Sequence, residues 1–306
     1  MAKVALRGLF ARKLRLVLTA LAVALGVTLI AGTYVFTDTI NRSFHRIFTQ
    51  SAKGTDASIT PRKPIDTSNN GGTQPTVSAA ILAQVRRQPG VQDADGSVFD
   101  VGTILGKDGK RIGKGGAPNF IASIADQPRF DAFTIKQGRK PRTADEVAMD
   151  ASTVAKQGWK LGDRIAIVAT APRKDYTLVG VTQIAGVDSF GGAAVADMRL
   201  AEAQRMLGKR GFDQIQAAAK PGVTPQQLRD QLKTALPRSV NVRTGQEEAR
   251  KQSSDVKGNL SFLTTLLLAF AGISLFVGAF IIFNTFSITV AQRTRENGLL
   301  RALGAG

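Results

Sequence analysis

Few residues in this sequence stand at the spacings that chemistry requires. Two glycine-containing stretches, GTILGKD (102–108) and RIGKGGAP (111–118), are similar to a phosphate-binding loop. Such a loop needs G-x-x-x-x-G-K followed by Ser or Thr, because the hydroxyl binds Mg²⁺ beside the phosphates. In both stretches the glycine spacing differs, and the residue after the lysine is Asp or Gly. We therefore predict hairpin turns here and no nucleotide site.

Metal-binding and nucleophilic chemistry lack their partners as well. The stretch DADGS (93–97) begins like a calcium loop but lacks the later ligands and the closing Glu, so we predict a turn. His45 is the only histidine, and there is no cysteine. A hydrolytic triad needs a positioned nucleophile and carboxylate around its histidine, and a zinc site usually needs further His or Cys ligands. We expect no catalytic residue, no metal and no cofactor in this chain.

Two long apolar stretches dominate the organisation of the chain. Residues 17–36 and 258–292 contain no charged side chain. Twenty helical residues at about 1.5 Å each cover about 30 Å, the thickness of the hydrocarbon core of a bilayer. The second stretch is longer than a bilayer needs, so part of it is expected to stand clear of the lipid. A cleaved signal peptide is the alternative for the first stretch, but the apolar run is long and no A-x-A site ends it.

The distribution of charge predicts the orientation. The basic residues Lys3, Arg7, Arg12, Lys13 and Arg15 precede the first stretch without any acid, and three arginines follow the second. Short basic flanks stay in the cytoplasm, so both ends are expected inside and residues 38–257 outside. The formal charge of +18 could suit nucleic acid, but the cations are scattered and aromatic side chains are few. We expect no nucleic-acid partner.

These observations divide the chain into five parts. We expect a cytoplasmic amphipathic helix (1–15), a transmembrane helix (16–37), an outer domain (38–257), a stalk with the second transmembrane helix (258–291) and a charged terminal helix (292–306). In the outer domain, helical patterns such as MRLAEAQRMLG (198–208) alternate with strand-like runs such as NFIASI (119–124). The predicted fold is a membrane protein in which two transmembrane α-helices flank an extracytoplasmic α+β domain.

The terminal helix carries a carboxylate among leucines. On a helical wheel Leu299, Leu300 and Leu303 share one face, Glu296 falls in its middle and Arg293 borders it. A protein groove that offers a basic partner suits this pattern, because a desolvated charge must be paired. A solvated helix whose glutamate pairs locally with Arg293 or Arg295 suits it equally. The residues alone leave both alternatives open.

The last residues resemble a known family. The segment NTFSITVAQRTRENGLLRALGAG (284–306) is similar to the signature that ends the second transmembrane helix of FtsX-like (MacB-type) ABC transporter permeases. The signature pairs an intramembrane Asn, here Asn284, with R-T-R-E and a leucine-rich A-L-G-A. Gln292 and Asn297 depart from it. The opening segment ALRGLFARKLRLVLTALAVALGV (5–27) and the outer segment QGRKPRTADEVAMDASTVAKQGWKLGDRIAI (137–167) resemble other parts of the same family.

The resemblance implies a function and partners. In the family the terminal segment is a coupling helix that binds a separate cytoplasmic ATPase. The implied contact residues are Arg293, Arg295, Glu296, Leu299, Leu300 and Leu303. ATP and Mg²⁺ would then belong to the partner ATPase, and the chain would be a non-catalytic permease subunit for export, lipid or lipoprotein handling, or mechanotransmission. Further implied partners are a second permease copy, membrane lipid and an extracytoplasmic cargo, in a bacterial cytoplasmic membrane. Family members continue with further spans, so we expect the same after Gly306.

Helix packing in the membrane provides a second set of candidates. Asn284 could hydrogen-bond to a neighbouring helix, and Gly26, Gly272 and Gly278 could let helices approach closely. A two-span sensor or scaffold, whose outer domain regulates cell-wall or signalling partners, would have the same topology. A sensor needs sustained heptads after the second span, and R-T-R-E with A-L-G-A offers none. The permease is therefore the favoured reading, and the sensor or scaffold is its alternative.

Overall fold

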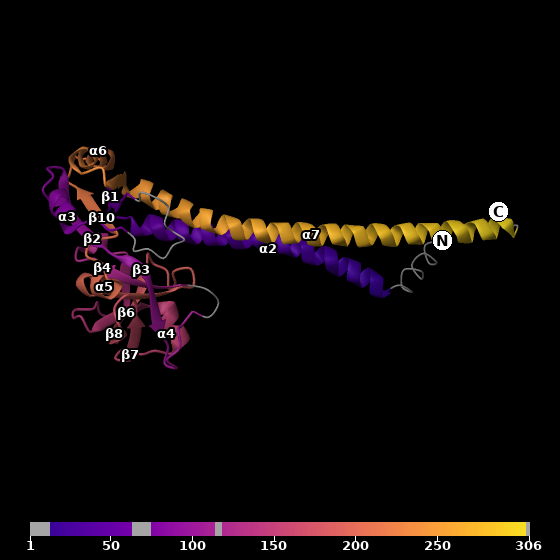
Figure 1. The fold of residues 1–306 in the computed structure, drawn as a ribbon, viewed down its shortest axis with the longest axis horizontal. Coiled ribbons are helices and arrows are strands. Elements are labelled where there is room, and N and C mark those ends of the chain that lie inside the picture. The colour runs from indigo at the N-terminus through magenta and orange to yellow at the C-terminus, as the bar shows by residue number, and fades with distance from the viewer. Residues whose placement is uncertain (1–12, 63–74, 114–117, 304–306) are drawn as a thin grey trace. The chain divides into compact units, whose positions relative to one another are not determined.

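The computed structural model describes residues 13–62, 75–113 and 118–303, which form two compact units (Figure 1). One unit comprises residues 1–41 and 256–306, and the other comprises residues 42–255. The predicted amphipathic helix at 1–15 lies almost entirely outside the described residues.

The first unit is a pair of long helices. Helix α2 (Lys13–Ser51) and helix α7 (Gly245–Ala302) both continue past the predicted transmembrane segments and into the second unit. Each contains a stretch that is long and apolar enough to cross a membrane, within Val23–Ser51 and Gly245–Arg295. Large apolar side chains such as Phe276 remain exposed along these stretches. Such exposure is costly in water and favourable in lipid, as expected for membrane-spanning helices.

The second unit, the outer domain, contains a large mixed sheet. The order across this sheet is β5 (Phe133–Gly138), β8 (Lys174–Ile184), β6 (Glu146–Asp150), β9 (Ala194–Arg199), β4 (Asn119–Ile124), β3 (Phe99–Leu105) and β7 (Arg164–Val168), and β7 also pairs with β8. The pairs β4–β9 and β6–β8 are parallel, and the other pairs are antiparallel. Helices α4 (Ala151–Gln157) and α5 (Leu200–Leu207) and the short 3₁₀ helix η1 (Pro128–Phe130) complete this part of the domain.

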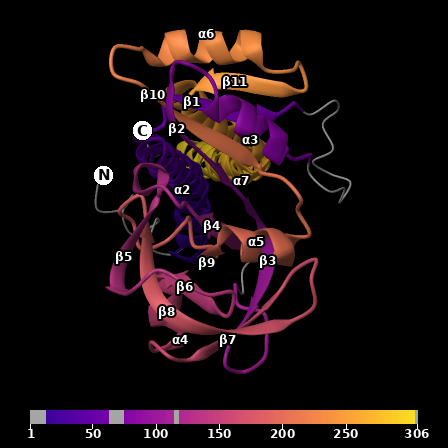
Figure 2. The same cartoon turned by 90° about the vertical axis from the view of Figure 1, so that its left-hand side faces the viewer.

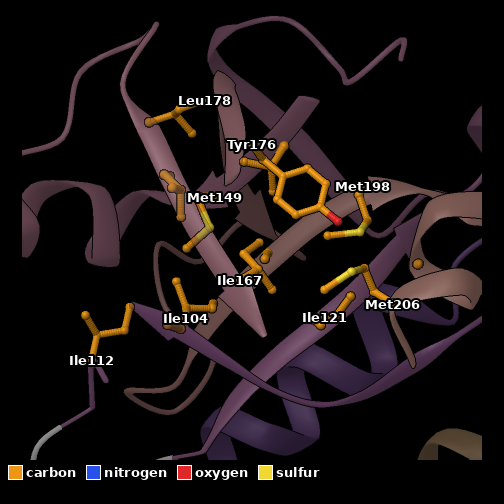
Figure 3. Packing of buried hydrophobic residues seen from close by; sticks show 14 of the residues in the cluster. Ile104, Ile112, Ile121, Met149, Ile167, Tyr176, Leu178, Met198 and Met206 are labelled. Carbon is orange, nitrogen blue, oxygen red and sulfur yellow. The ribbon is translucent and has the colours of Figure 1, made fainter. Parts of the chain in front are cut away.

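The main hydrophobic core lies on one face of the large sheet (Figure 3). Strand residues Ile121, Met149, Ile167 and Met198 are fully buried there, and Met206 of α5 packs against them. Neighbouring strand residues point to the opposite face because side chains alternate along a strand. The same sheet therefore has a second buried face, on which Ala122, Ile184 and Val195 lie.

A smaller antiparallel sheet has its own core. Its strands, in spatial order, are β11 (Val240–Thr244), β1 (Ala57–Pro61), β10 (Gln214–Ala219) and β2 (Val91–Ser97). Helices α3 (Ala79–Arg86) and α6 (Pro225–Ala235) cover this sheet, as Figure 2 shows. Helix α6 begins with a capping box in which the Thr224 hydroxyl accepts from the Gln227 backbone and the Gln227 side chain accepts in return. The predicted combination of two long apolar helices and an α+β domain is thereby confirmed.

One local prediction was wrong. Residues 93–97, expected to form a turn, lie inside β2, where Ala94 pairs with Ala217 and Asp95 with Gln216. Asp95 is buried, and its carboxylate accepts hydrogen bonds from the backbone nitrogens of Gly96, Asp126 and Gln127. Polar Asp-Gly sequences favour turns locally, but strand pairing with β10 satisfies this backbone and overrides the local preference.

Candidate functional site

The terminal turns of helix α7 carry the predicted coupling residues. The helix continues to Ala302, and the Leu303 backbone nitrogen still donates to the Leu299 carbonyl at 3.1 Å. The side chain of Leu299 is 59% exposed and that of Leu303 is 83% exposed. Two exposed leucines one helical turn apart form an apolar stripe that the described part of this chain leaves uncovered.

The charged members of the segment are exposed too. Arg293 and Arg295 lie on the surface of α7 and make no ion pair with any residue that the structure describes. The side chains of Glu296 and Leu300 lie outside the described residues, so their predicted contacts stay predictions. Helical conformation over the whole segment brings the predicted coupling residues onto neighbouring turns. Their partners stay a prediction of the sequence.

Two of the predicted packing glycines are enclosed in the helix pair. A Cβ atom added at Gly26 would lie 3.7 Å from Leu275 of helix α7, and Gly278 is buried. The other two candidates face outward. Gly272 has no neighbouring atom within 4 Å of such a Cβ position, and Asn284 is exposed. Packing roles for Gly272 and Asn284 stay predictions, and they require helices beyond this pair.

Threonines make polar contacts that the sequence did not reveal. The hydroxyls of Thr37 in α2 and Thr264 in α7 lie 3.1 Å apart and share a hydrogen bond. Thr33 is 4% exposed, and its hydroxyl donates to the Leu29 carbonyl one turn earlier. Hydroxyls within apolar helices need such partners because lipid offers none. Threonines at positions 33 and 37, one turn apart, are the signal that could have indicated this interface.

The end of helix α2 is embedded in the outer domain by aromatic side chains. Ile47 is buried against the second face of the large sheet. The Phe190 ring lies between two pairs of rings, at 5.3 Å from Phe44 and 6.3 Å from Phe48 on α2, and at 5.6 Å from Phe99 and 5.7 Å from Phe120 on the sheet. Edge-to-face arrangements at such distances are favourable beyond the buried area. This aromatic cluster fixes the point where α2 enters the domain.

A glycine-containing loop shapes the cluster. Ala185, Gly186, Gly191 and Gly192 all have positive φ angles, which turn the chain sharply around Phe190. A Cβ atom at Gly191 would lie 2.8 Å from the Phe44 ring, closer than packing allows. Glycine is therefore required where the loop meets α2. The contacting residues are far apart in the sequence, which explains why pattern analysis missed the cluster.

Helix α7 begins in the small sheet with ionic and capping contacts. The Thr244 backbone nitrogen donates to the Glu247 carboxylate at 2.8 Å, and the Glu247 nitrogen donates to the Thr244 hydroxyl at 3.1 Å. This reciprocal cap lowers the pKa of Glu247, helped by Arg229, which donates to the same carboxylate at 2.7 Å. Arg243 also pairs with the mostly buried Glu248 at 2.8 Å. These contacts tie the first turn of α7 to β11 and α6.

A polar hollow lies where both helices meet the small sheet. Its lining comes from the end of α2, from β10 and from the first turns of α7, and includes Gln214, Gln216, Glu248 and Gln252. Gln216 donates to the Thr55 hydroxyl at 3.1 Å and Gln214 to the Ser58 hydroxyl at 2.8 Å. The lining amides thus join β10 to the segment that follows α2.

A buried glutamate organises one end of the main core. Glu202 accepts hydrogen bonds from the Tyr176 hydroxyl and from Arg205, both at 2.6 Å, and from Lys174 at 3.0 Å. Burial alone would raise the pKa of Glu202, but these donors hold it at about 2. Burial and the neighbouring carboxylate raise the pKa of Tyr176. A carboxylate whose donors all come from the chain has a structural role.

A second buried carboxylate has the opposite character. Asp197 is fully buried, and its Oδ2 accepts from the Thr182 hydroxyl at 2.6 Å, while its Oδ1 has no partner. Burial, with Asp150 and Asp131 nearby, raises its pKa well above the ordinary value. Among the described residues, no three His, Cys, Asp or Glu side chains are placed to hold a metal ion. Asp197 is therefore a buried acid whose surroundings favour its protonated form.

Comparisons with known proteins agree with this architecture. The family model for the MacB-like periplasmic core domain matches residues 16–235, and the model for the FtsX-like permease C-terminal region matches residues 268–306. An uncharacterized ABC transporter permease of Methanocaldococcus jannaschii is 28% identical over 152 residues, which is 48% of this chain and 36% of that protein. The macrolide export ATP-binding/permease protein MacB of Bdellovibrio bacteriovorus is 24% identical over 249 residues, 76% of this chain and 38% of that protein.

Among solved structures, the periplasmic region of MacB from Actinobacillus actinomycetemcomitans matches 67% of this chain and 94% of that structure, with 13% identity and a TM-score of 0.46. At this score the structural likeness adds nothing to the assignment, which rests on the family models. The chain spans less than two fifths of the length of the two relatives described above. The periplasmic core model alone covers more than two thirds of the chain, and the permease model covers its terminal segment. This chain therefore belongs to the FtsX-like, MacB-type permeases of ABC transporters.

Proposed function

We propose that this chain couples a separate cytoplasmic ATPase to movement of the outer domain. The observation that carries the proposal is the exposed stripe of Leu299 and Leu303 at the end of α7, beside Arg293 and Arg295. An apolar stripe with adjacent charges is typical of a helix that docks into a protein groove. It lies within the region that matches the FtsX-like permease model, where an ATPase partner is expected.

Helix α7 supplies the proposed transmission path. It is continuous from Gly245 to Ala302, and its first turn is held to the small sheet by Thr244, Glu247 and Arg229. ATP binding and hydrolysis would take place on the partner subunit. A displacement of the terminal turns would then reach the outer domain through a single helix.

The aromatic cluster supplies the second attachment. Helix α2 enters the domain at Phe44 and Phe48, which pack on Phe190. A movement of α7 relative to α2 would therefore act on two different parts of the domain, the small sheet and the second face of the large sheet. We propose that this opens or closes the domain around a cargo or partner, either for export or as mechanotransmission.

The assembly and location follow from the same proposal. Two permease copies would present two coupling helices to a dimer of ATPase subunits. The start of α2 and the end of α7, which both carry basic residues, would lie in the cytoplasm. The protein would reside in the cytoplasmic membrane, with residues 38–257 outside. The ATPase, the second copy, surrounding lipid and an outer cargo are the proposed partners.

The test is co-purification of the complete membrane protein with its candidate ATPase in detergent. The double variant Leu299→Asp, Leu300→Asp places two carboxylates on the apolar stripe. If the stripe fills a groove, burying unpaired charges there disfavours the complex, and the ATPase should be lost from the eluate. Glu296→Lys should leave the permease folded but abolish its stimulation of ATP hydrolysis.

The matched control introduces a carboxylate at another exposed apolar position. Val101 is 53% exposed in the outer domain, and Val101→Asp should leave ATPase co-elution unchanged. Co-elution that survives the double substitution would contradict a coupling role for the stripe. A sensor or scaffold function for the outer domain would then become the better explanation.

A further inference from the structure

One part of the outer domain carries lysine and arginine side chains on two neighbouring segments. Residues 105–112 form a hairpin turn after β3, and residues 156–163 connect the last turn of α4 to β7. Together these segments contain five cations and two carboxylates. We call four of the cations the basic patch: Lys110, Arg111, Lys156 and Lys160.

Lys107 holds the two segments together. Its Nζ donates to the Gly158 carbonyl at 2.9 Å and pairs with the Asp163 carboxylate at 2.9 Å. Within the hairpin, the Gly106 nitrogen donates to the Lys110 carbonyl at 2.8 Å. A Cβ atom at Gly106 would lie 3.0 Å from the Gln157 side chain, next to Lys156. The two segments that carry these cations therefore lie against each other, although they are about fifty positions apart in the sequence.

The two carboxylates are already engaged by the chain. Asp163 binds Lys107 and accepts from the Lys160 backbone nitrogen at 3.1 Å, and the Lys107 contact lowers the pKa of Asp163. Asp108 accepts from the Lys110 backbone nitrogen at 3.1 Å, which closes the turn. Asp163 also interacts electrostatically with Lys160, but neither carboxylate forms an ion pair with a cation of the basic patch.

The cations of the basic patch are exposed, and none forms an ion pair within the described parts of the chain. Some cations elsewhere in the domain are paired, as Lys209 is with Asp213 and Arg243 with Glu248. An apolar side chain, Leu161, lies next to Lys160 and is 47% exposed. Cations without an ion pair, one of them beside an exposed leucine, suit an interface that offers both anionic groups and apolar groups.

We propose that the basic patch binds anionic lipid headgroups of the bilayer that holds this chain. The domain is connected to that bilayer through α2 and α7, so the lipid surface is present at a high effective concentration. Each lysine or arginine near an anionic surface raises the ratio of bound to unbound domain by about fivefold. Leu161 would enter the headgroup region beside Lys160.

An acidic protein surface would attract the same cations. The lipid is the better occupant because the chain itself keeps it in reach and because Leu161 adds an apolar contact that a bilayer can accept. The proposal goes beyond ATPase coupling and does not depend on it. Lipid binding would give the domain a resting position set by the membrane composition.

The experiment uses the full chain in nanodiscs of phosphatidylcholine, with or without phosphatidylglycerol. The chain contains no cysteine, so a fluorophore on Ala155→Cys, an exposed position of α4 beside Lys156, reports on the patch alone. Lipids with a nitroxide headgroup serve as quenchers. We expect stronger quenching in discs that contain phosphatidylglycerol, and its loss at high salt, because about 1 M salt reduces the screening length to about 3 Å.

Variants assign the effect to the basic patch. The quadruple variant Lys110→Gln, Arg111→Gln, Lys156→Gln, Lys160→Gln should lose the phosphatidylglycerol-dependent quenching. Single Lys→Gln substitutions should each reduce the bound-to-unbound ratio by about fivefold. The charge-conserving variant Lys110→Arg, Lys156→Arg, Lys160→Arg should keep the phosphatidylglycerol-dependent quenching. Emission of Trp159, the single tryptophan and a buried core residue, shows whether each variant is folded.

A charge-matched control uses four exposed cations in the helices and loops around the smaller sheet. These cations also lack ion pairs within the described residues, and the control variant is Arg87→Gln, Lys220→Gln, Lys233→Gln, Arg238→Gln. The fluorophore on this control variant should be quenched as strongly as on the chain with the basic patch intact. Equal quenching with and without phosphatidylglycerol would overturn the proposal, and an acidic protein would then be the occupant to test. Equal losses in the patch and control variants would also overturn it, because total charge would then explain the effect.

Discussion

At the scale of single residues, the outer domain contains two buried acids with opposite protonation behaviour. Glu202 is surrounded by Arg205, Lys174 and Tyr176, and these donors keep it ionised. Asp197 has one hydroxyl donor, an unpartnered oxygen and two further acids nearby. Burial penalises both carboxylates, so the number of donors decides which of them keeps its charge.

Asp197→Asn should stabilise the outer domain at neutral and higher pH. The folded-state pKa of Asp197 is raised, so its stabilising contribution is complete below the ordinary value of 3.8 and is lost as pH rises through the folded pKa. The asparagine side chain has nearly the same shape as aspartate but does not ionise, so it avoids the cost of a buried charge. The unfolding temperature, followed by Trp159 fluorescence, should rise by a few degrees at pH 8, at about 2–4 °C per kcal/mol for a domain of this size.

The pH dependence of the difference distinguishes this explanation from a simple packing effect. The gain from Asp197→Asn should shrink as pH falls below the folded pKa, because the wild-type carboxyl is then neutral. Asp126, which is exposed, serves as the control: Asp126→Asn should leave the unfolding temperature unchanged at every pH. A gain that is the same at acidic and alkaline pH would show that Asp197 is not protonated on folding.

At the scale of elements, the close approach of α2 and α7 depends on small side chains. Gly26 faces Leu275, and the Thr37 and Thr264 hydroxyls meet at 3.1 Å. Between helices in lipid, dispersion contacts and hydrogen bonds take over the role that the hydrophobic effect has in water. A larger side chain at Gly26 must therefore separate the helices or move Leu275.

Gly26→Leu should weaken this helix pair, and Gly272→Leu should not. In the double variant Thr37→Cys, Thr264→Cys, the two thiols should form a disulfide readily under mild oxidation, because the hydroxyls that they replace lie 3.1 Å apart. The chain has no other cysteine that could compete. Gly26→Leu should reduce the cross-linked fraction severalfold because the Cβ position already touches Leu275. Gly272 has open space around its Cβ position, so its leucine variant is the matched control. Similar yields in both variants would argue against close packing at Gly26.

Elements differ in how far local sequence predicts them. The strand-like run at 119–124 coincides with β4, and the helical pattern at 198–208 coincides with α5. The polar β2 was mistaken for a turn, because its strand conformation depends on pairing with β10 more than one hundred positions later. Apolar patterns are local signals, whereas pairing with a distant strand is not.

At the scale of the whole molecule, two apolar helices flank the outer domain, and we predict that both cross the membrane and hold the domain on one side of it. Cysteine labelling in intact cells should show which side. Ser239→Cys, exposed in the outer domain, should react with a membrane-impermeant maleimide. Thr294→Cys, near the end of α7, should react only after permeabilisation. The cysteine-free parent chain gives the background. Labelling of Thr294→Cys alone in intact cells would reverse the proposed orientation.

The sequence by itself determined the two apolar helices, the α+β class of the domain and the resemblance of the terminal segment to a permease family. These features depend on neighbouring residues: the length of an uncharged run, a short periodicity or a contiguous motif. Only the tertiary structure decided which residues meet. It brought Phe44, Phe99 and Phe190 together, left Asp197 with a single hydroxyl donor and placed Lys107 against Gly158. Such contacts join positions far apart in the chain, and chain folding alone sets their distances.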